Sequence, residues 1–256
     1  MDLGLRDRVC VITASTAGVG LAAAGMLAEE GAKVVTCSRR EDAPGVGEAL
    51  HVSADLSDPA APGELIRRAE SELGRVDVLV NNVGDSYLVK FDQLSEEQWE
   101  GMWQLNVMSY VRAIQAALPG MRERGDGVIV NVSSTAGKRP SSGMPNYSVT
   151  KAAVLSLSRL VADLYAKDGI LCNAVTPGPT LSDTWLAPGR LADQTAEQTG
   201  KTRDDVLHSI GAGRPLGRLA EPEEIASVIV FLCSARASYV TGAAWSADGG
   251  TVPVII

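Results

Sequence analysis

Short apolar runs rich in β-branched residues alternate with longer helical patterns along this 256-residue chain, and that alternation constrains the fold most strongly. The opening shows the repeating unit: a strand at 9–13, a glycine-bearing turn, a helix that ends at Gly31, and a second strand at 33–37. Because the strand cores are continuously apolar, both faces of the sheet must be covered. The pattern predicts a doubly wound α/β fold of the Rossmann type with a mainly parallel sheet.

The same alternation continues to the end of the chain. Five further strands bring the predicted sheet to seven, at 50–53, 76–80, 128–132, 170–175 and 243–246. The helices that cover it are predicted at 59–73 (capped by Ser57 or Asp58), 95–118 (opened by a Ser95–Gln98 capping box), 146–167 and 222–233. No linker or repeat divides the chain, so we expect one domain over 1–256. The insertion after 180, with a helix near 203–210, is expected to form a helical lid at about 181–213.

Charge and composition exclude several classes of function. The net charge is −8 and no basic run occurs, so we expect no nucleic-acid partner and no attraction to an anionic membrane surface. No apolar run approaches the span of a bilayer, and the start of the chain lacks the shape of a signal peptide, which predicts a cytoplasmic protein. Four scattered cysteines are expected to be buried hydrophobes in a reducing compartment. With only His51 and His208, a metal site or a Ser–His–Asp triad is disfavoured.

The turn after the first strand has the composition of a phosphate-binding loop. In the segment 13–20, Gly18 and Gly20 open a helix directly after the strand. Exposed N–H groups at a helix N-terminus, approached without a Cβ, suit the pyrophosphate of a dinucleotide. Glycine pairs at such turns also serve tight packing alone, so this motif leaves both interpretations open.

The residues after the second strand bear on which nucleotide is bound. An acid there would accept a hydrogen bond from the ribose of NAD, whereas a base would pair with the 2′-phosphate of NADP. The chain has Ser38, Arg39 and Arg40 here, with no acid before Glu41. This order favours NADP, with NAD as the alternative, and a solvated basic loop is the interpretation without a ligand.

A third cluster has the outline of a proton-transfer site. The strand at 128–132 leads to Ser133 and Ser134, and Tyr147 and Lys151 stand one helical turn apart at the start of the next helix. An ammonium beside a phenol is expected to lower the phenol pKa. A serine hydroxyl nearby would hold a carbonyl oxygen. Strand alternation points the two serines to opposite faces, so Ser134 is favoured and Ser133 is expected to be packed or bonded to the backbone.

Taken together, these motifs resemble the short-chain dehydrogenase/reductase family over nearly the whole chain. The similarity is to the single-domain branch that contains many 3-oxoacyl-carrier-protein reductases and sugar or steroid dehydrogenases. It rests on the turn at 13–20, the segment 81–84, the helix asparagine Asn106, the Ser134–Tyr147–Lys151 set and the late GRLAEPEEIA and SADGG segments. The resemblance implies a cofactor site made of Thr13, Ser15, Thr16, Gly18, Val19, Gly20, Ser38, Arg39, Arg40, Asp55, Leu56, Asn82, Val83, Gly84, Tyr147, Lys151, Pro177, Gly178 and Thr180.

The resemblance also implies the chemistry, which is hydride transfer between nicotinamide C4 and a carbonyl or secondary alcohol. Tyr147 would move the proton, Lys151 would lower the Tyr147 pKa and hold the nicotinamide ribose, and Ser134 would orient the reacting oxygen. Asn106 would hold a water that links Lys151 to solvent. We expect NADPH-dependent reduction of a ketone, 3-oxoacyl-like. The alternatives are an NAD-linked secondary-alcohol dehydrogenase for a sugar, steroid or similar substrate, and a nucleotide-binding scaffold without catalysis.

Two departures from the family pattern affect the cofactor site. Ala14 stands where the family has its first turn glycine, which a chain tolerates if the local dihedral angles are negative. The connection between the second and third strands is short, and the helix usual there is expected to be missing, which leaves the adenosine side open. Ala17 replaces a basic residue of many NADP-users, so the phosphate would rest on Arg39 and Arg40.

The substrate and the assembly are the least constrained by the sequence. The small-molecule carbonyl or alcohol is expected to meet apolar lid residues, or these residues pack the lid itself: Trp185, Leu186, Leu191 and Ile210, with Val83, Asp85, Ser86, Tyr87 and Met144 opposite. Family members are usually dimers or tetramers, so we expect a homo-oligomer formed through the helices at 95–118 and 146–167. The apolar tail at 252–256 is expected to be buried against a neighbouring subunit.

Overall fold

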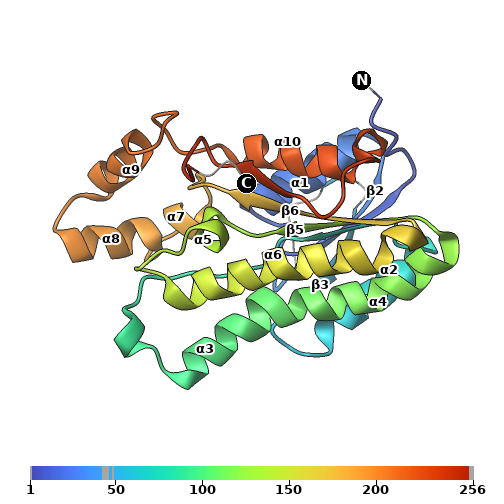
Figure 1. Cartoon of the computed structure of the whole chain (residues 1–256), viewed down its shortest axis with the longest axis horizontal. Coiled ribbons are helices and arrows are strands. Elements are labelled where there is room, and N and C mark those ends of the chain that lie inside the picture. The colour runs from blue at the N-terminus through green and yellow to red at the C-terminus, as the bar shows by residue number, and fades with distance from the viewer. Residues whose placement is uncertain (1, 42–45, 48, 254–256) are drawn as a thin grey trace.

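The computed structural model describes residues 2–41, 46–47 and 49–253 (Figure 1). Its seven strands form a single sheet in which every neighbouring pair is parallel, in the order β3-β2-β1-β4-β5-β6-β7. The predicted seven-stranded α/β sheet is therefore confirmed. The strands are β1 (Val9–Ile12), β2 (Lys33–Ser38), β3 (Leu50–Ser53), β4 (Val78–Asn81), β5 (Gly127–Val132), β6 (Ile170–Pro177) and β7 (Ala244–Ala247).

The strand order reverses between β1 and β4. From β1 the chain moves outward through β2 and β3, and it then crosses back so that β4 pairs with the other side of β1. The chain leaves β1 toward one edge of the sheet, and it leaves β4 toward the other edge. A crevice therefore opens at the carboxyl ends of these strands, where ligands bind in sheets of this type.

Helices cover both faces of the sheet, as the continuously apolar strands require (Figure 1). One face packs against α1 (Gly18–Glu29) and α10 (Pro222–Cys233), and the other against α2 (Ala61–Leu73), α4 (Ser109–Arg124) and α6 (Pro145–Tyr165). Each face has its own apolar cluster, because successive strand residues point to opposite sides. The fully buried helix residues Leu27, Ile225 and Ile229 belong to one cluster, and Leu65, Ile66 and Met121 to the other.

Local chemistry sets several helix ends. Gly31 follows the end of α1 with φ of +83°, a left-handed conformation that costs glycine little. Neither predicted cap, Ser57 nor Asp58, caps α2, because its N-cap residue is Ala60 and no side chain bonds the first N–H groups of the helix. Asp58 Oδ1 instead accepts a hydrogen bond from the Ala60 N–H at 2.9 Å, just before the helix begins. The predicted capping box opens α3 (Glu96–Trp103), where Ser95 and Gln98 each bond the other's backbone N–H.

The helix predicted at 95–118 differs from the expectation in two ways. It is interrupted by a π-helical turn, Gln104–Met108, and α4 then continues through Pro119 to Arg124. A proline normally ends a helix, which is why the pattern predicted an end at 118. Here the fully buried Met121 lies beyond the proline and packs into the core, so tertiary packing outweighs the local preference.

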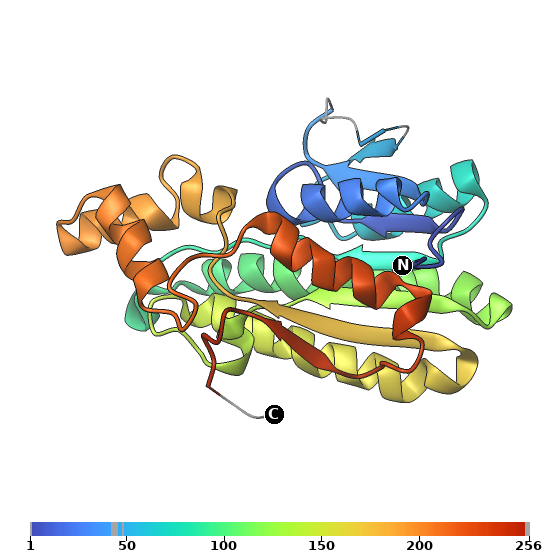
Figure 2. The same cartoon turned by 90° about the horizontal axis from the view of Figure 1, so that it is seen from above.

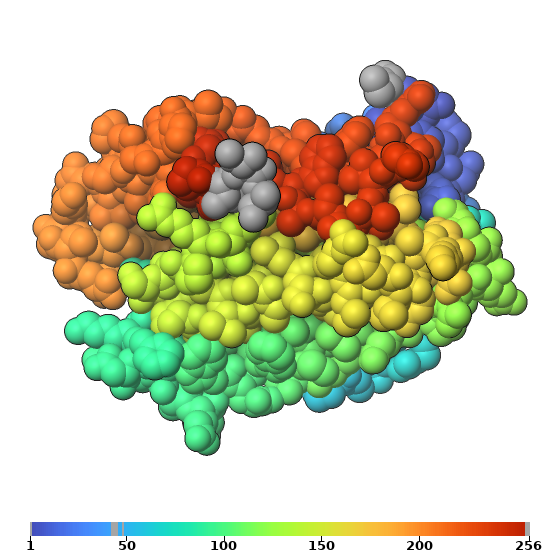
Figure 3. Space-filling view, viewed as in Figure 1, coloured from blue at the N-terminus to red at the C-terminus, as the bar shows by residue number. Residues whose placement is uncertain are grey.

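The insertion after β6 forms three short helices beyond the carboxyl ends of the strands (Figure 2). These are α7 (Asp183–Leu186), α8 (Leu191–Thr199) and α9 (Arg203–Ala212), and we call residues 181–219 the lid. Figure 3 shows the lid, in orange, projecting at one end of the molecule. Its two ends are joined at the base, because the N–H of Leu181 donates to the Ala220 carbonyl oxygen at 2.8 Å.

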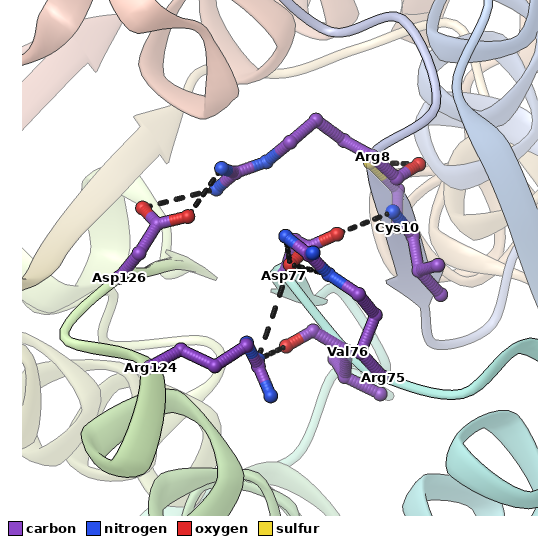
Figure 4. A network of polar contacts seen from close by, with 8 residues as sticks. Arg8, Cys10, Arg75, Val76, Asp77, Arg124 and Asp126 are labelled. Carbon is purple, nitrogen blue, oxygen red and sulfur yellow. Dashed lines mark hydrogen bonds and ion pairs between the residues drawn. The ribbon is translucent and has the colours of Figure 1, made fainter.

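A buried carboxylate ties the opposite, amino-terminal edge of the sheet together (Figure 4). Asp77 is fully buried and accepts hydrogen bonds from the Val9 N–H at 2.8 Å and from Arg75 Nε at 2.6 Å. Arg124, from the end of α4, adds an ion pair at 3.9 Å. Asp77 thus links β1, the approach to β4 and α4 far from the crevice.

Two expectations fall on residues that the structure leaves undescribed. The missing helix between β2 and β3 concerns a connection of which 42–45 and 48 lie outside the described residues. Of the apolar tail, Val252 is buried and Pro253 is exposed, and 254–256 lie outside as well. Over the described ranges, no helix combines the length and the apolar character needed to cross a bilayer.

Candidate active site

A cleft of about 1090 Å³ lies over the carboxyl ends of the strands and below the lid. Its walls come from segments that are far apart in the sequence, including the turn after β1, the ends of β2 to β6 and the lid helices. Most of the predicted site residues meet here. Those that line the cleft are Thr16, Gly18, Val19, Ser38, Arg39, Arg40, Asp55, Leu56, Asn82, Val83, Gly84, Ser134, Tyr147, Lys151, Pro177, Gly178 and Thr180.

The turn after β1 has the form of an anion cradle. Helix α1 begins at Gly18, and its N-cap residue Ala17 provides no side-chain cap, so the first N–H groups are free to meet a ligand. Glycine is required at position 20, because a Cβ there would lie 2.4 Å from the Ala14 carbonyl oxygen and 2.6 Å from Asn82 Nδ2. The close packing of the turn and the open helix end together fit the phosphates of a nucleotide.

An alanine at position 14 was expected to be tolerated only if its backbone dihedral angles were negative, and this condition is not met. Its φ is +50°, in the left-handed region that favours glycine. For an alanine this conformation costs about 1 kcal/mol. The carbonyl oxygen of Ala14 accepts a hydrogen bond from Asn82 Nδ2 at 3.1 Å, and this contact helps to hold the strained turn.

Three residues predicted to contact the cofactor, Thr13, Ser15 and Gly20, do not line the cleft, and the first two bond inward through their side chains. Thr13 Oγ1 accepts hydrogen bonds from the N–H groups of Asn82 at 2.8 Å and Val83 at 3.0 Å. Ser15 Oγ donates to the carbonyl oxygen of Ile12, at the end of β1, and accepts from the Cys37 N–H at 3.0 Å. Both side chains are buried, because they join β1 to the ends of β4 and β2. They shape the cleft without lining it.

The adenosine end of the cleft carries two exposed arginines. Arg39 and Arg40 follow β2, and the Arg40 N–H donates to Ser38 Oγ at 3.1 Å, which shapes the turn. Opposite them, hydrogen bonds from Ser57 hold the Asp55 pKa below its usual value, and the charge of Arg39 lowers it further. A phosphate ester would complement these guanidinium groups.

His51 is a residue of this region that the sequence reasoning missed. One ring nitrogen, Nε2, lies 2.8 Å from the Arg40 carbonyl oxygen, and the other, Nδ1, lies 3.0 Å from Thr36 Oγ1. The histidine therefore links β2 and β3 to the arginine turn. No sequence signal identified it, since the link depends on the register that pairs Thr36 with His51.

Tyr147 and Lys151 stand on the first turns of α6, and both line the cleft beside Ser134. Ser134 caps the short helix α5 (Thr135–Lys138), accepting from the Ala136 N–H at 3.1 Å, and its hydroxyl also takes part in a hydrogen bond with Tyr147. Ser133 faces the other way and donates to the Lys151 carbonyl oxygen at 2.7 Å. The expectation that Ser133 is backbone-bonded is confirmed.

The predicted lowering of the Tyr147 pKa by Lys151 is wrong for the protein without a ligand. Desolvation raises the pKa of Tyr147, and a hydrogen bond with Ser134 lowers it only in part. Lys151 is buried, and burial lowers its pKa to about 7. At neutral pH Lys151 is therefore only partly protonated, so less positive charge is present beside the phenol than was expected.

Asn106 lies in the π-helical turn and does not line the cleft. Its Oδ1 accepts from the Asp85 N–H and its Nδ2 donates to the Asp85 carbonyl oxygen, both at 3.0 Å. A third contact joins Nδ2 to Thr150 Oγ1 at 3.3 Å, beside Lys151 in the sequence. The amide therefore couples helix α6 to the segment after β4, and its role in a water relay stays a prediction.

The nicotinamide end is expected where β6 ends. Gly178 packs tightly, because a Cβ there would lie 2.9 Å from the Cα of Asp248. Thr180 Oγ1 donates to the Gly178 carbonyl oxygen at 3.0 Å and shapes the same loop. Gly84 packs closely on the lysine, because a Cβ there would lie 3.2 Å from Lys151 Nζ. Lys151, Gly84 and Gly178 all line the same cleft.

The substrate end is built from the lid and the segment after β4. Of the expected residues, Trp185, Leu191, Val83, Asp85, Ser86 and Met144 line the cleft. Leu186, Ile210 and Tyr87 do not. The sequence reasoning missed Leu88, Arg190 and Arg214 as lining residues, since nothing in the local pattern marks a lid arginine as facing a cleft.

The cysteines are all free and buried, as expected. Burial raises the pKa of the Cys10, Cys37 and Cys172 thiols to about 12, which keeps them unreactive. Among the residues that the structure describes, no three His, Cys, Asp or Glu side chains gather in a way that could hold a metal ion.

Comparisons with known proteins place the whole chain among oxidoreductases. A family profile described as enoyl-(acyl carrier protein) reductase matches residues 13–252. The chain is 37% identical over 263 residues to cis-4-hydroxycyclohexanecarboxylate dehydrogenase of Sinomonas cyclohexanicum, covering 99% of this chain and 100% of that one. It is 34% identical over 260 residues to the 3-oxoacyl-acyl-carrier-protein reductase of Thermotoga maritima, covering 97% and 99%. The crystal structure of Gluconobacter frateurii L-sorbose reductase, complexed with NADPH and L-sorbose, matches with a TM-score of 0.93 and 35% identity over 100% of both chains.

Proposed function

This chain belongs to the short-chain dehydrogenase/reductase family and is an NAD(P)-dependent oxidoreductase acting on CH–OH and C=O groups, and from that premise we propose that it reduces a ketone with NADPH. The observation that carries the proposal is the meeting of Ser134, Tyr147 and Lys151 in the cleft that also holds the Gly18 turn. A proton donor, an orienting hydroxyl and a nucleotide cradle thus share one space.

The protonation state of Tyr147 supports the reductive direction. Because desolvation raises its pKa, the phenol is protonated at neutral pH, which is the form that donates a proton to a developing alkoxide. Ser134, which stands beside the Tyr147 hydroxyl, would hold the same oxygen through its own hydroxyl. Lys151, poised near neutral pH, would replace the proton and hold the nicotinamide ribose.

The residues at the nucleotide end fit the cofactor. The helix start at Gly18 would hold the pyrophosphate, and Arg39 and Arg40 would hold a 2′-phosphate. The crevice at the reversal of strand order would place the nicotinamide by Gly178 and Gly84. When bound, the dinucleotide supplies the hydride. The sorbose reductase structure, which contains NADPH, supports the same preference in this chain.

Two ketone classes are candidates for the substrate. A 3-oxoacyl-like ketone is supported by the 34% identity with the reductase of Thermotoga maritima. A hydroxylated ketone, the sugar-like alternative, is supported by polar groups at the substrate end, which are described in the next subsection. An NAD-linked alcohol dehydrogenase would use the same residues in the opposite direction.

A panel of ketones and secondary alcohols, followed with NADPH, NADH and their oxidised forms, tests the proposal. We expect NADPH to be consumed with at least one ketone and NADH to be used less efficiently. Faster turnover of an alcohol with NAD would favour the dehydrogenase interpretation. Nucleotide binding without turnover of any compound would favour the non-catalytic scaffold.

We also propose a homo-oligomer assembled through the helices predicted at 95–118 and 146–167, which correspond to α3 with α4 and to α6. Large apolar side chains of α6 are exposed, namely Val149, Leu160 and Leu164 at 50%, 54% and 58%. Trp103, at the end of α3, is 37% exposed. Burial of these side chains against a second copy would remove apolar surface from water, and light scattering would measure the resulting mass.

The cysteine chemistry supports a cytoplasmic location, which stays a proposal. All four thiols are buried without a disulfide. Disulfides are characteristic of oxidising compartments, so four free cysteines fit a reducing one.

A further inference from the structure

An acidic residue, Asp85, lies in the part of the cleft wall that also holds Tyr147 and Lys151. Asp85 follows Gly84, whose Cα faces the ammonium of Lys151, and its backbone N–H and C=O are both bonded to Asn106 at 3.0 Å. The Asp85 side chain is therefore presented to the cleft from a backbone that is held on both sides. Its charge reaches the phenol, since it is one of the groups that raise the Tyr147 pKa.

A lid arginine meets this carboxylate across the cleft. Arg190 lies at the N-cap of α8, and its Nη2 forms an ion pair with Asp85 Oδ1 and a hydrogen bond with the Ser86 carbonyl oxygen at 3.3 Å. Gln194, one turn later, accepts from the Leu88 N–H at 2.9 Å. Helix α8 is thus tied to the segment after β4, and this positions the guanidinium.

The pair keeps hydrogen-bonding groups that the protein does not use. Asp85 Oδ1 also accepts from the Ser86 N–H at 2.8 Å, whereas Oδ2 has no partner among the described residues. Over the same ranges, Arg190 Nε and Nη1 have none either. Both side chains line the cleft and are partly exposed, at 42% and 31%. One acceptor and several donors therefore face the substrate end, side by side.

We propose that Asp85 and Arg190 are specificity-determining residues that recognise hydroxyl groups next to the reacting carbonyl, so that the substrate is a neutral polyhydroxylated ketone. The inference rests on the proposed function, because it takes Tyr147 as the proton donor to a ketone. A hydroxyl group both donates and accepts, so adjacent hydroxyls match the free Oδ2 and the free guanidinium N–H groups together.

The same pair disfavours the other ketone classes. A carboxylate beside the carbonyl would meet the Asp85 charge as well as the Arg190 guanidinium, so repulsion by the first offsets attraction by the second. An apolar chain would remove water from the ion pair without replacing its hydrogen bonds, which is costly for charged groups. A site built to hydrogen-bond a hydroxyl discriminates against an analogue that lacks it.

A matched series of small ketones tests the inference: acetone, hydroxyacetone, dihydroxyacetone, a ketopentose and the anion acetoacetate, each with NADPH. We expect kcat/KM to rise at least about tenfold from acetone to hydroxyacetone, and again with further hydroxyls. Asp85→Asn and Arg190→Gln should each bring the ratio of hydroxyacetone to acetone close to unity. Circular dichroism and the melting temperature show whether each variant is folded.

Arg203→Gln is the matched control. Arg203 is also a lid arginine with an acidic partner, Asp193 at 3.4 Å, but it does not line the cleft. The Arg203→Gln substitution loosens the lid without changing the substrate end of the cleft. The ratio of kcat/KM for hydroxyacetone to that for acetone should therefore equal that of the wild type. The preference should be lost only in the two cleft variants.

The outcomes separate the inference from the function on which it rests. Reduction of acetone or acetoacetate as efficiently as of hydroxyacetone overturns the inference and leaves the proposed reductase intact. An unchanged ratio in folded Asp85→Asn and Arg190→Gln also overturns it. Absence of NADPH consumption with every ketone contradicts the proposed function, and the inference fails with it.

Discussion

The Nζ atom of Lys151 lies 5.8 Å from the centroid of the Tyr147 ring and donates a hydrogen bond to the Val132 carbonyl oxygen at 2.9 Å. The lysine is thus anchored to the end of β5 and stands close to the phenol. Lys151 is buried and Tyr147 is partly buried in the cleft wall, and desolvation moves the two pKa values in opposite directions: down for the lysine and up for the tyrosine.

The pH dependence of stability follows from Lys151. Its pKa is about 7 in the folded protein and 10.5 in an unfolded chain, so between these values the unfolded state binds more protons. The free energy of unfolding attributable to this group therefore rises with pH above about 7, by ~1 kcal/mol per pH unit. Below that pH Lys151 is protonated in both states, so its burial lowers the free energy of unfolding by an amount that does not change with pH.

Lys151→Met isolates this contribution. Urea unfolding of both proteins between about pH 7 and pH 8.5 should show the wild type gaining stability relative to the variant, and the ionisation of unfolded cysteines cancels in the comparison because both proteins contain the same four cysteines. A difference that does not change with pH would show that Lys151 keeps an ordinary pKa when folded.

Ala14→Gly should stabilise the protein. The substitution relieves the left-handed conformation at φ of +50°, which outweighs the extra freedom of glycine in the unfolded chain by about 0.5 kcal/mol. Thermal unfolding measures the gain. Gly20→Ala is the opposing control and should destabilise, since its Cβ would clash with the Ala14 carbonyl oxygen. A loss of stability in Ala14→Gly would mean that the turn is unstrained.

Asp77→Ala should cost about 2–3 kcal/mol of unfolding free energy. The substitution leaves the Val9 N–H without its buried acceptor and removes two arginine contacts. Asp126→Ala, which removes the more exposed Arg8 partner, should cost less than about 1 kcal/mol. Equal costs in urea unfolding would contradict the importance of burial.

Arg39→Ala should weaken the use of NADPH and spare that of NADH. Loss of a charge-assisted contact to the 2′-phosphate is expected to raise KM for NADPH about tenfold, with little change in kcat. Arg68→Ala on the exposed side of α2, where Arg68 pairs with Glu72, is the matched control. An unaltered KM for NADPH would remove Arg39 from the phosphate site.

Much of the fold could be predicted because its signals are local. Apolar runs and helical periodicity gave seven strands and the main helices, and the capping residue Ser95 marked the start of α3. The π-helical turn at Asn106 and the passage of α4 through Pro119 depend on packing between distant segments. No local pattern contains that information.

The candidate site divides in the same way. Tyr147 and Lys151 are recognisable because one helical turn separates them, whereas Asp85 and Arg190 meet across 105 residues of sequence. Thr13 and Ser15 belong to the right motif, but only the structure shows that their side chains turn inward. The direction of the Tyr147 pKa likewise depends on desolvation, which spacing does not reveal.

Tyr147→Phe tests the central claim most directly. The phenol oxygen is the proposed proton donor, and its removal leaves the ring that packs in the cleft. With a ketone that the wild type reduces, we predict that the folded variant binds NADPH with the wild-type dissociation constant and loses at least about a hundredfold in kcat. Turnover at the wild-type rate in this variant would contradict the account.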